Sequence, residues 1–325
     1  MIHTFKMHFP LHHTEIQKLQ RRFGIVYTEV NEYFKGQFDG VTMTIFNKGM
    51  GEWRLSMIID AIKLLKNPKI SEGDYPRLER EIKLILLHVL GDPSYYSDHV
   101  LQRIDYRYDV VIGDDNTKQL LVDLYKKLTR SHKFQKKYLG KVNEDGIYEP
   151  YETTVYHSSK STEAVVYLKE EERKAKGEVI EEYEKDVLRY EVRLKEGHLY
   201  YMEKKDDAAK RPRKLNVYMK GKLYRHYFKR YMSHIYHPCS FYKLDEAREI
   251  IRKSTLTDRN KEKLIDFLKA VSSYDLDTPL KKMTKETRKR RLQHLKALGI
   301  NPVPIPKNYD NAPSSLSNPL DGFPW

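Results

Sequence analysis

The sequence predicts an α+β protein with a mostly antiparallel sheet and flanking helices, followed by a helical C-terminal region. Three observations lead to this fold class. Strand-like runs occur in pairs joined by short turns, as in hairpins. Helical patterns stand between these pairs and do not alternate regularly with single strands, which argues against a doubly wound parallel sheet. Beyond residue 233 the pattern is helical.

The N-terminal part contains one predicted hairpin and one long helix. Residues 41–46, "VTMTIF", and 53–59, "WRLSMII", are strand-like and are joined by "NKGMGE", whose two glycines suit a turn. Residues 74–91 then predict a helix, with Pro76 in its first turn and Gly91 at its end.

The middle of the chain contains the remaining predicted strands. A strand at 101–112 precedes an amphipathic helix at 116–130. A second hairpin joins residues 151–158 and 163–169, and a charged helix at 170–185 leads to a strand at 187–195.

The domain organisation follows from shifts in composition. Residues 204–230 contain eleven basic and two acidic side chains, which indicates a basic linker or arm. Helical patterns follow at 243–253, 257–271 and 283–299. We therefore expect a first domain at 1–200, a basic linker or arm at 201–232, a helical region at 233–308 and a flexible tail at 309–325.

Composition limits the classes of partner and compartment. The 325 residues carry a formal net charge of +14 and a pI near 9.4, which favours a polyanionic partner, nucleic acid ahead of a membrane surface. No apolar run is long enough to span a membrane, and the N-terminus lacks the apolar core of a signal peptide. A single cysteine, Cys239, excludes an internal disulfide. We expect a cytoplasmic protein.

Strand alternation sorts charged residues of the later strands onto one face. In "RIDYRYDVV" the residues Ile104 and Tyr106 share the apolar face, whereas Asp105 and Asp109 share the other. The same split of the next two strands extends the polar face, which we expect to form one surface from these residues: Asp105, Asp109, Tyr167, Lys169, Arg189 and Glu191.

That face contains the residue types needed for phosphoryl transfer. A tyrosine phenol titrates near 10, so attack on a phosphodiester at neutral pH requires a nearby cation, and Lys169 stands two residues from Tyr167. Carboxylates can hold a divalent cation, with Asp105 and Glu191 as first choices and Glu172 reaching back from the helix. The alternative is a wet sheet face with ordinary charge pairs.

Three motifs in order resemble those of the gene II family of filamentous-phage replication proteins. These are "RID" at 103–105, "VVYLKEEE" at 165–172 and "LRYEVRLK" at 188–195. The Tyr-x-Lys-x-x-Glu element is also similar to that of rolling-circle plasmid initiators and related conjugative relaxases. The resemblance covers about residues 40–200, and "TRKRRLQHLKALGI" looks like the helical end of the same proteins.

The resemblance implies a relaxase-like nicking and closing enzyme that initiates rolling-circle DNA replication. Such an enzyme cuts one strand at an origin, keeps the 5′ phosphate as a phosphotyrosine and leaves a 3′-OH for a polymerase. By motif position Tyr167 is the nucleophile, with Lys169 and Glu172 as its catalytic partners. Asp105, Glu191 and Asp109 are the candidate ligands of Mg²⁺ or Mn²⁺.

The resemblance also implies partners, namely single-stranded and duplex origin DNA together with a host helicase and DNA polymerase. The chain has no phosphate-binding loop of its own for a helicase. Two alternatives stay open: a conjugative relaxase with the same chemistry, and a non-enzymatic helix-turn-helix DNA-binding protein in which the tyrosine is structural.

The sequence departs from many relaxases because it lacks their His-x-His pair, so we expect a mainly acidic metal site. His157 could supply one nitrogen ligand, but a structural role is the more usual one for it and for His198.

Basic residues in two places are expected to contact DNA. Residues 278–300 predict the turn and second helix of a helix-turn-helix-like unit, with Leu292, Leu295 and Leu298 facing the core. The expected contacts are Arg103, Arg189 and Arg193 on the strands, and Lys285, Arg288, Lys289 and Arg291 on the helix. The alternative for that helix is a solvated basic face.

Overall fold

The computed structural model describes residues 1–325 except 50, 129–134, 137–139, 143–147 and 151. Within this described part, eight strands follow the sheet order β2-β3-β1-β4-β10-β9-β8-β5. Their bounds are β1 Ile2–Leu11, β2 Val41–Asn47, β3 Trp53–Asp60, β4 Val100–Val111, β5 Gln135–Lys136, β8 Thr154–Ser158, β9 Thr162–Leu168 and β10 Val187–Leu194. The pairs β2–β3, β1–β3, β1–β4 and β5–β8 are antiparallel, so the predicted α+β class with a mostly antiparallel sheet is confirmed.

The chain divides into two compact units that do not follow the predicted boundary at residue 200. Unit 1 contains Met1–Arg107, Lys160–Glu163 and Glu191–Phe228. Unit 2 contains Tyr108–Ser159, Ala164–Tyr190 and Lys229–Trp325. The C-terminal helices therefore belong to the same compact unit as the strand that carries Tyr167.

Strand β1 of unit 1 was not predicted. It pairs with β3 from Thr4↔Asp60 to Leu11↔Trp53, and its alternate residues Phe5, Met7 and Phe9 are fully buried. The histidines and the lysine between these apolar residues interrupt the hydrophobic run, which hides the strand from a scan for continuous apolar segments. The alternation itself is the signal that could have found it.

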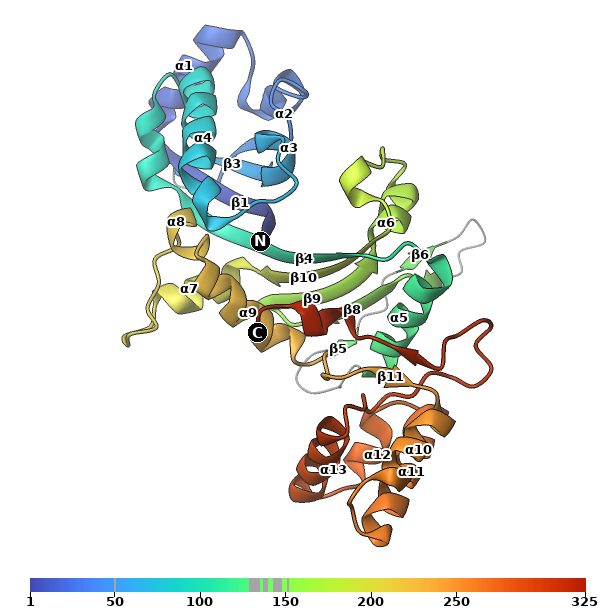
Figure 1. Ribbon diagram of the computed structural model, residues 1–325. Coiled ribbons are helices and arrows are strands. Elements are labelled where there is room, and N and C mark those ends of the chain that lie inside the picture. Colours follow the sequence, from blue (N-terminus) through green and yellow to red (C-terminus); the bar gives the residue numbers. More distant parts are fainter. Residues whose placement is uncertain (50, 129–134, 137–139, 143–147, 151) are drawn as a thin grey trace. The chain divides into compact units, whose positions relative to one another are not determined.

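The predicted elements of unit 1 around β2 and β3 are confirmed. The hairpin of β2 and β3 turns through Gly49 and Gly51, both at positive φ. The long predicted helix is α4 (Tyr75–Leu90), which ends at Gly91 in the left-handed conformation. Figure 1 shows α4 beside α1 (His13–Phe23) on one side of β1 and β3, near the short helices α2 (Val30–Tyr33) and α3 (Ala61–Leu65).

The segment predicted as a basic arm, 201–232, is partly helical and contributes to the core instead. It contains the end of α7 (Glu196–Glu203), then α8 (Leu215–Tyr218) and α9 (Gly221–Met232). Tyr218 and Tyr227 are almost fully buried. The basic side chains lie between aromatic and aliphatic residues at helical spacing, so the segment is amphipathic and buries its apolar side.

In unit 2 the second predicted hairpin corresponds to the neighbouring strands β8 and β9, which precede α6 (Lys169–Lys176). The predicted helix at 170–185 is wrong in its length, because Gly177 adopts a left-handed conformation and ends α6. A 3₁₀ turn, η4 (Glu182–Glu184), follows. The amphipathic helix before the hairpin is α5 (Asp115–Leu128); its two last predicted residues, 129–130, and the first residue of the hairpin, 151, lie outside the described residues.

The C-terminal part of unit 2 contains the helices that the sequence predicts. They are α10 (Leu244–Lys253), α11 (Asp258–Ser273), α12 (Asp277–Lys281) and α13 (Lys285–Ala297), which lie together in Figure 1. The Thr284 hydroxyl caps α13 by accepting the Thr287 N–H at 3.3 Å. The smaller elements of the described chain are β6 (Gly140–Val142), β7 (Tyr148–Pro150), β11 (Phe241–Tyr242), β12 (Ser315–Leu316), η1 (Tyr27–Glu29), η2 (Glu72–Asp74), η3 (Pro93–Asp98) and η5 (Pro319–Gly322).

The tail at 309–325 is ordered and packed, which corrects the prediction of a flexible segment. β12 pairs with β11, and Asn318 accepts a hydrogen bond of 2.6 Å from the Tyr125 hydroxyl. Leu320 is fully buried, and Trp325 stacks on Tyr236 with ring centroids 4.2 Å apart. The apolar residues between the prolines and serines hold the tail in place, and composition alone overlooks them.

Candidate functional site

The predicted polar face of the later strands is buried, not open to solvent. All seven residues of β9 are buried, and so are seven of the eight residues of β10. Asp105, Lys169, Arg189 and Glu191 are each at most 4% exposed. Burial of so many charges is tolerated because oppositely charged side chains pair there. The alternative of a wet sheet face anticipated charge pairs but not their burial.

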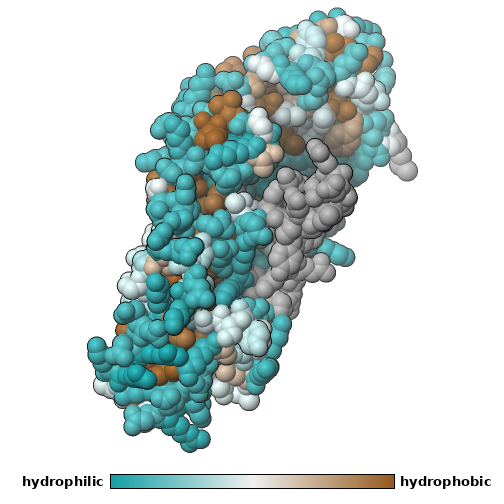
Figure 2. Space-filling view, turned by 90° about the vertical axis from the view of Figure 1, so that its right-hand side faces the viewer, coloured by the Kyte–Doolittle hydropathy of each residue, from teal (hydrophilic) through white to brown (hydrophobic). Residues whose placement is uncertain are grey.

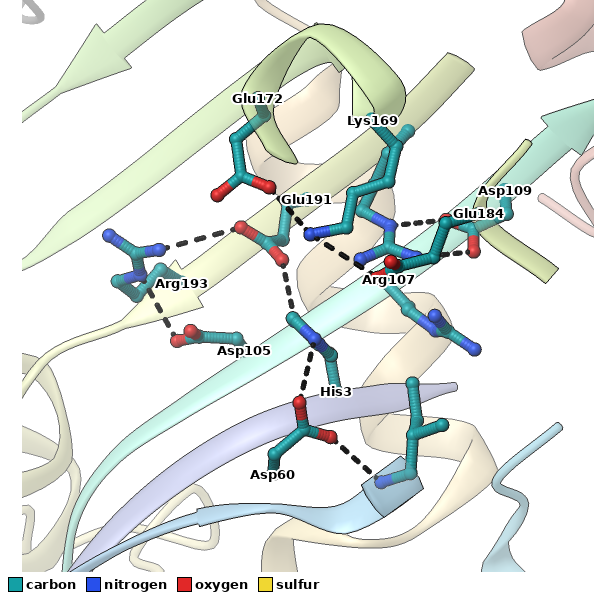
Figure 3. Close-up of polar contacts among 12 residues, drawn as sticks. His3, Asp60, Asp105, Arg107, Asp109, Lys169, Glu172, Glu184, Glu191 and Arg193 are labelled. Atoms are coloured by element: carbon teal, nitrogen blue, oxygen red, sulfur yellow. Dashed lines mark hydrogen bonds and ion pairs between the residues drawn. The ribbon is translucent and has the colours of Figure 1, made fainter. Parts of the chain in front are cut away.

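The three predicted catalytic residues of unit 2 lie together. Tyr167 is 8% exposed near the end of β9, and the Lys169 ammonium lies 5.9 Å from the centroid of its ring. Lys169 begins α6, and its Nζ donates to Glu172 Oε2 at 2.6 Å from the first turn of the same helix (Figure 3). The strand-to-helix junction places all three close together, because Tyr167 lies near the end of β9 and Lys169 and Glu172 lie three residues apart in the first turn of α6.

Sequence reasoning missed Glu184, the buried carboxylate of this group. Its Oε1 lies 3.5 Å from Lys169 Nζ, and both of its oxygens accept hydrogen bonds from the Arg173 guanidinium. We call Lys169, Glu172, Arg173 and Glu184 the Lys169 cluster. No periodic pattern singled out Glu184, because it sits in the short turn η4 after the early end of α6.

The pKa values in the Lys169 cluster shift with burial and charge. Burial, together with the nearby positive charge of Arg189, lowers the pKa of Lys169 despite the opposing effect of Glu172. Burial would raise the pKa of Glu184, but the hydrogen bond from Arg173 and the charges of Lys169 and Arg173 lower it. The cluster therefore keeps an ionised glutamate beside a lysine that is easier to deprotonate than usual.

Arg189 and Asp109 form a second ion pair in unit 2, in which the arginine is buried and the aspartate side chain is 22% exposed. Arg189 is fully buried, and its Nε and Nη2 donate to the two oxygens of Asp109 at 2.8 and 2.9 Å. A guanidinium in this bidentate arrangement is committed to its carboxylate. The predictions that Arg189 contacts DNA and that Asp109 binds a metal ion therefore do not fit the structure.

Unit 1 contains a corresponding group around Arg193, which we call the Arg193 cluster: Asp105, Glu163, Glu191 and Arg193. Arg193 donates from Nε to Asp105 at 3.2 Å, from Nη1 to Glu163 at 2.7 Å and from Nη2 to Glu191 at 3.4 Å. Figure 3 shows Arg193 directed at both Asp105 and Glu191. Both Arg193 and Arg103, which donates from Nε to Asp105 at 2.8 Å, were predicted to contact DNA, but here they neutralise carboxylates.

His3 is a second residue that the sequence analysis missed. Its ring lies between two carboxylates, with Nδ1 3.2 Å from Glu191 Oε1 and Nε2 3.5 Å from Asp60 Oδ2 (Figure 3). Asp60 also caps α3 by accepting from the backbone N–H groups of Ile62 and Lys63. Although burial opposes it, the hydrogen bond and charge of His3 and the two backbone N–H groups lower the pKa of Asp60 to about 2.

The predicted acidic metal site does not match the contacts of its residues. Both oxygens of Asp105 accept hydrogen bonds from Arg103, and those of Asp109 accept from Arg189. Glu191 has two possible metal ligands near it, His3 and Asp60. The carboxylates of Glu191 and Asp60, however, lie at opposite nitrogens of the His3 ring. One metal ion therefore cannot bind all three side chains in these positions. Within the described part of the chain, no three His, Cys, Asp or Glu side chains are grouped to hold a metal ion.

The histidines that the sequence analysis weighed are buried. His198 packs edge-on against Tyr227 with ring centroids 5.1 Å apart, which is a structural role. His157 is 1% exposed in β8.

The predicted DNA-binding helix is only partly as expected. Lys285, Arg288 and Lys289 are exposed on α13, and Arg288 Nε donates to the Met283 carbonyl oxygen at 3.0 Å. Arg291, expected on the outer side, is buried together with Leu295. A helical wheel drawn from the leucines alone misplaces Arg291, because it shares the buried side of the helix with Leu295.

Comparison with models of known protein families and with curated proteins finds no match to this chain. Among the described residues, no helix is both long and apolar enough to cross a membrane.

Proposed function

We propose that this protein is a tyrosine-dependent DNA nickase and strand transferase that initiates rolling-circle replication. The observation that supports this proposal most is the junction of β9 and α6, where a buried Lys169 of lowered pKa lies against the ring of Tyr167. The order of the three sequence motifs gives the reaction class. Duplex and single-stranded origin DNA, a host helicase and a host polymerase are the partners that such a reaction requires.

In the proposed reaction the Tyr167 oxygen attacks the phosphorus of one phosphodiester and loses its proton. The bond from phosphorus to the 3′ oxygen breaks, and that oxygen takes up a proton to become the 3′-OH. The 5′ phosphate stays on Tyr167 as a phosphotyrosine, and attack by a 3′-OH reverses the step and rejoins a strand. The positive charge of Lys169 favours the phenolate, and Glu172 with Glu184 holds the ammonium in place.

A divalent cation belongs to the proposal as a cofactor that neutralises charge on the phosphate. Glu191 would supply a carboxylate oxygen, the ligand type that Mg²⁺ and Mn²⁺ prefer. Asp105 and Asp109 are not part of this assignment, because arginines occupy their oxygens.

The test is covalent capture of a labelled single-stranded oligonucleotide that carries the origin sequence. The wild-type protein should form an SDS-resistant adduct, and Tyr167→Phe should abolish it while DNA binding is retained, because only the attacking oxygen is removed. Tyr201→Phe is the matched control, since Tyr201 is an exposed tyrosine of α7. An adduct at the wild-type level in Tyr167→Phe rejects the assignment. No adduct from the wild type would favour the non-enzymatic DNA-binding protein.

The role of Lys169 is tested by the rate of nicking. Lys169→Ala should slow cleavage by about 10²–10⁴, the range of positioned acid–base groups. Lys174→Ala removes an exposed lysine of the same helix and should leave the rate unchanged. A pH–rate profile that Lys169→Ala leaves unaltered would exclude stabilisation of the phenolate by this residue.

The cation assignment is tested by the dependence of nicking on Mg²⁺ or Mn²⁺ concentration. Glu191→Gln should raise the concentration that gives half the maximal rate, because an amide lacks the charge that a hard cation favours. Glu163→Gln is the control, since Glu163 is also bound to Arg193. Equal saturation curves for the two variants would remove Glu191 from the cation site.

A further inference from the structure

Arg291 of α13 is buried without a hydrogen-bond partner for its Nε among the described residues. It is 8% exposed and, with Leu295, one of the two buried residues of the helix. Burial lowers the pKa of Arg291, and the positive charge of Arg290 adds to this, against the opposing effect of Asp266. A buried guanidinium left incompletely paired costs stability, and an anion that binds from outside would relieve this cost.

Further cations from α11 and α13 lie near Arg291. The charges of Arg259, Arg291 and Arg290 all lower the pKa of Lys263, with Arg259 having the largest effect and slight desolvation adding to it. Arg259 and Lys263 are four residues apart and therefore share one side of α11. We call Arg259, Lys263, Arg290 and Arg291 the α11–α13 cluster.

The α11–α13 cluster differs from other cations of the same helix in lacking carboxylate partners. Lys261 and Lys269 of α11 pair with Asp258 at 3.7 Å and with Asp266 at 3.0 Å. In the part of the chain that the structure describes, no member of the cluster forms an ion pair within 4.0 Å. The charge of Asp266 opposes the repulsion at Arg291 only in part, and Asp266 already pairs with Lys269.

We propose that the α11–α13 cluster binds the phosphate backbone of duplex DNA, with Arg291 as the forked donor and the other three residues as surrounding positive charge. Arginine suits this position because its planar guanidinium can bind two phosphate oxygens at once. Figure 2 shows mainly hydrophilic residues over the lower end of the molecule, where α10–α13 lie. A formal charge of +14 favours a polyanion over an apolar protein partner.

This site differs from the one that the sequence predicts, because it uses α11 as well as α13 and includes neither Lys285 nor Lys289. It does not depend on the phosphotyrosine chemistry. A protein that binds duplex DNA here without nicking would support this inference and reject the proposed function, so the two can fail separately.

The first experiment compares two double variants of α11 that each lose two positive charges. Arg259→Ala/Lys263→Ala removes the unpaired cations, and Lys261→Ala/Lys269→Ala removes the paired ones as a matched control. Affinity for a short DNA duplex is measured at several salt concentrations. The slope of log K against log salt concentration should become shallower by up to about 2 in the first variant, because each of its two lost phosphate contacts contributes roughly 0.9. The control variant should change the slope by less than half as much. Equal slopes for the two variants overturn the proposal.

The second experiment replaces the buried member of the cluster. Arg291→Met keeps much of the side-chain volume and removes the charge, so duplex affinity should fall about tenfold or more while the melting temperature stays equal or rises. A lower melting temperature with unchanged duplex affinity would make Arg291 a structural residue and overturn its role. Stronger binding of an RNA duplex or of heparin, with the same dependence on the cluster, would reject DNA as the partner.

Discussion

The Lys169 cluster of unit 2 and the Arg193 cluster of unit 1 differ in charge balance and in the burial of their cations: two cations face two carboxylates in the first, and one arginine faces three carboxylates in the second. In the Lys169 cluster the Lys169 and Glu184 side chains are 2% and 1% exposed. In the Arg193 cluster the Arg193 side chain is 25% exposed, although those of its partners Asp105, Glu163 and Glu191 are only 1%, 6% and 5% exposed. The Arg193 cluster follows from the alternation of charged residues along β4, β9 and β10, whereas the Lys169 cluster lies in α6 and η4, so the strand pattern alone does not predict the second cluster.

The difference teaches that the number of ion pairs is a poor guide to their energetic weight. Burial of an ion pair costs desolvation free energy, and removal of one partner leaves the other charge buried where water cannot solvate it. An exposed pair gains little, because solvent screens it and can replace either partner. Four variants test this contrast, taken from the largest expected effect to the smallest.

Glu184→Gln should have the largest effect. The amide keeps the size of the side chain but removes the charge that Arg173 and Lys169 face, and we expect a loss of about 3 kcal/mol of unfolding free energy. Urea denaturation measures it. Glu182→Gln, in the same 3₁₀ turn but with an 86% exposed side chain, should change little. Equal losses for the two glutamates would contradict the weight that we give to burial.

Asp60→Asn should have the next largest effect, and the effect should depend on pH. The folded pKa of Asp60 is about 2, below its ordinary value of 3.8, so its stabilisation is present above about pH 4 and is lost as the pH falls towards 2. The shift corresponds to about 2 kcal/mol. Asparagine preserves the cap of α3, which isolates the charge.

Unfolding free energies of wild type and Asp60→Asn, measured from pH 2 to pH 7, should therefore differ at neutral pH and converge at the acidic end. A constant difference across that range would exclude ionised Asp60 as the source.

Arg193→Met should cost less, about 1–2 kcal/mol, because its partners keep other cations. Asp105 retains Arg103, and Glu163 retains Lys195. The double variant Arg103→Met/Arg193→Met should cost more than the sum of the two single variants, since the buried Asp105 then loses both guanidinium groups. Strict additivity in this cycle would show that the two arginines do not share Asp105 energetically.

Much of the fold could be predicted from the sequence, since its elements are local patterns. The hairpin of β2 and β3, the helix α4 and the helices α10–α13 follow from alternation, helical periodicity and caps. The errors arose where composition was used in place of pattern. The segment predicted as a basic arm and the proline-rich tail both contain residues that are buried in the core, such as Tyr227 and Leu320. A count of charges or prolines does not detect such residues.

The candidate site could be predicted only where its residues are close in sequence. Tyr167, Lys169 and Glu172 meet because a strand runs directly into a helix. Glu184 and His3 were missed, because the first follows an early helix end and the second lies on β1, whose alternation a scan for continuous apolar runs passes over. Pairing across strands, which commits Asp105 and Asp109 to arginines, depends on sheet order and register, and these are long-range properties.

Lys174→Ala should have the smallest effect and completes the comparison. Lys174 lies in α6, as do Lys169 and Arg173, and it pairs with Glu171 at 2.7 Å, a distance as short as those in the buried Lys169 cluster. Its side chain is 58% exposed, and the glutamate side chain is 41% exposed, so water solvates both groups when the pair is broken. We expect a change in unfolding free energy below about 0.5 kcal/mol, and none at raised salt concentration. The test is urea denaturation of Lys174→Ala and of Glu184→Gln in the same buffer. The two ion pairs have nearly equal N–O distances but very different burial. A loss from Lys174→Ala comparable to that from Glu184→Gln would mean that helix α6 depends on its pairs irrespective of burial.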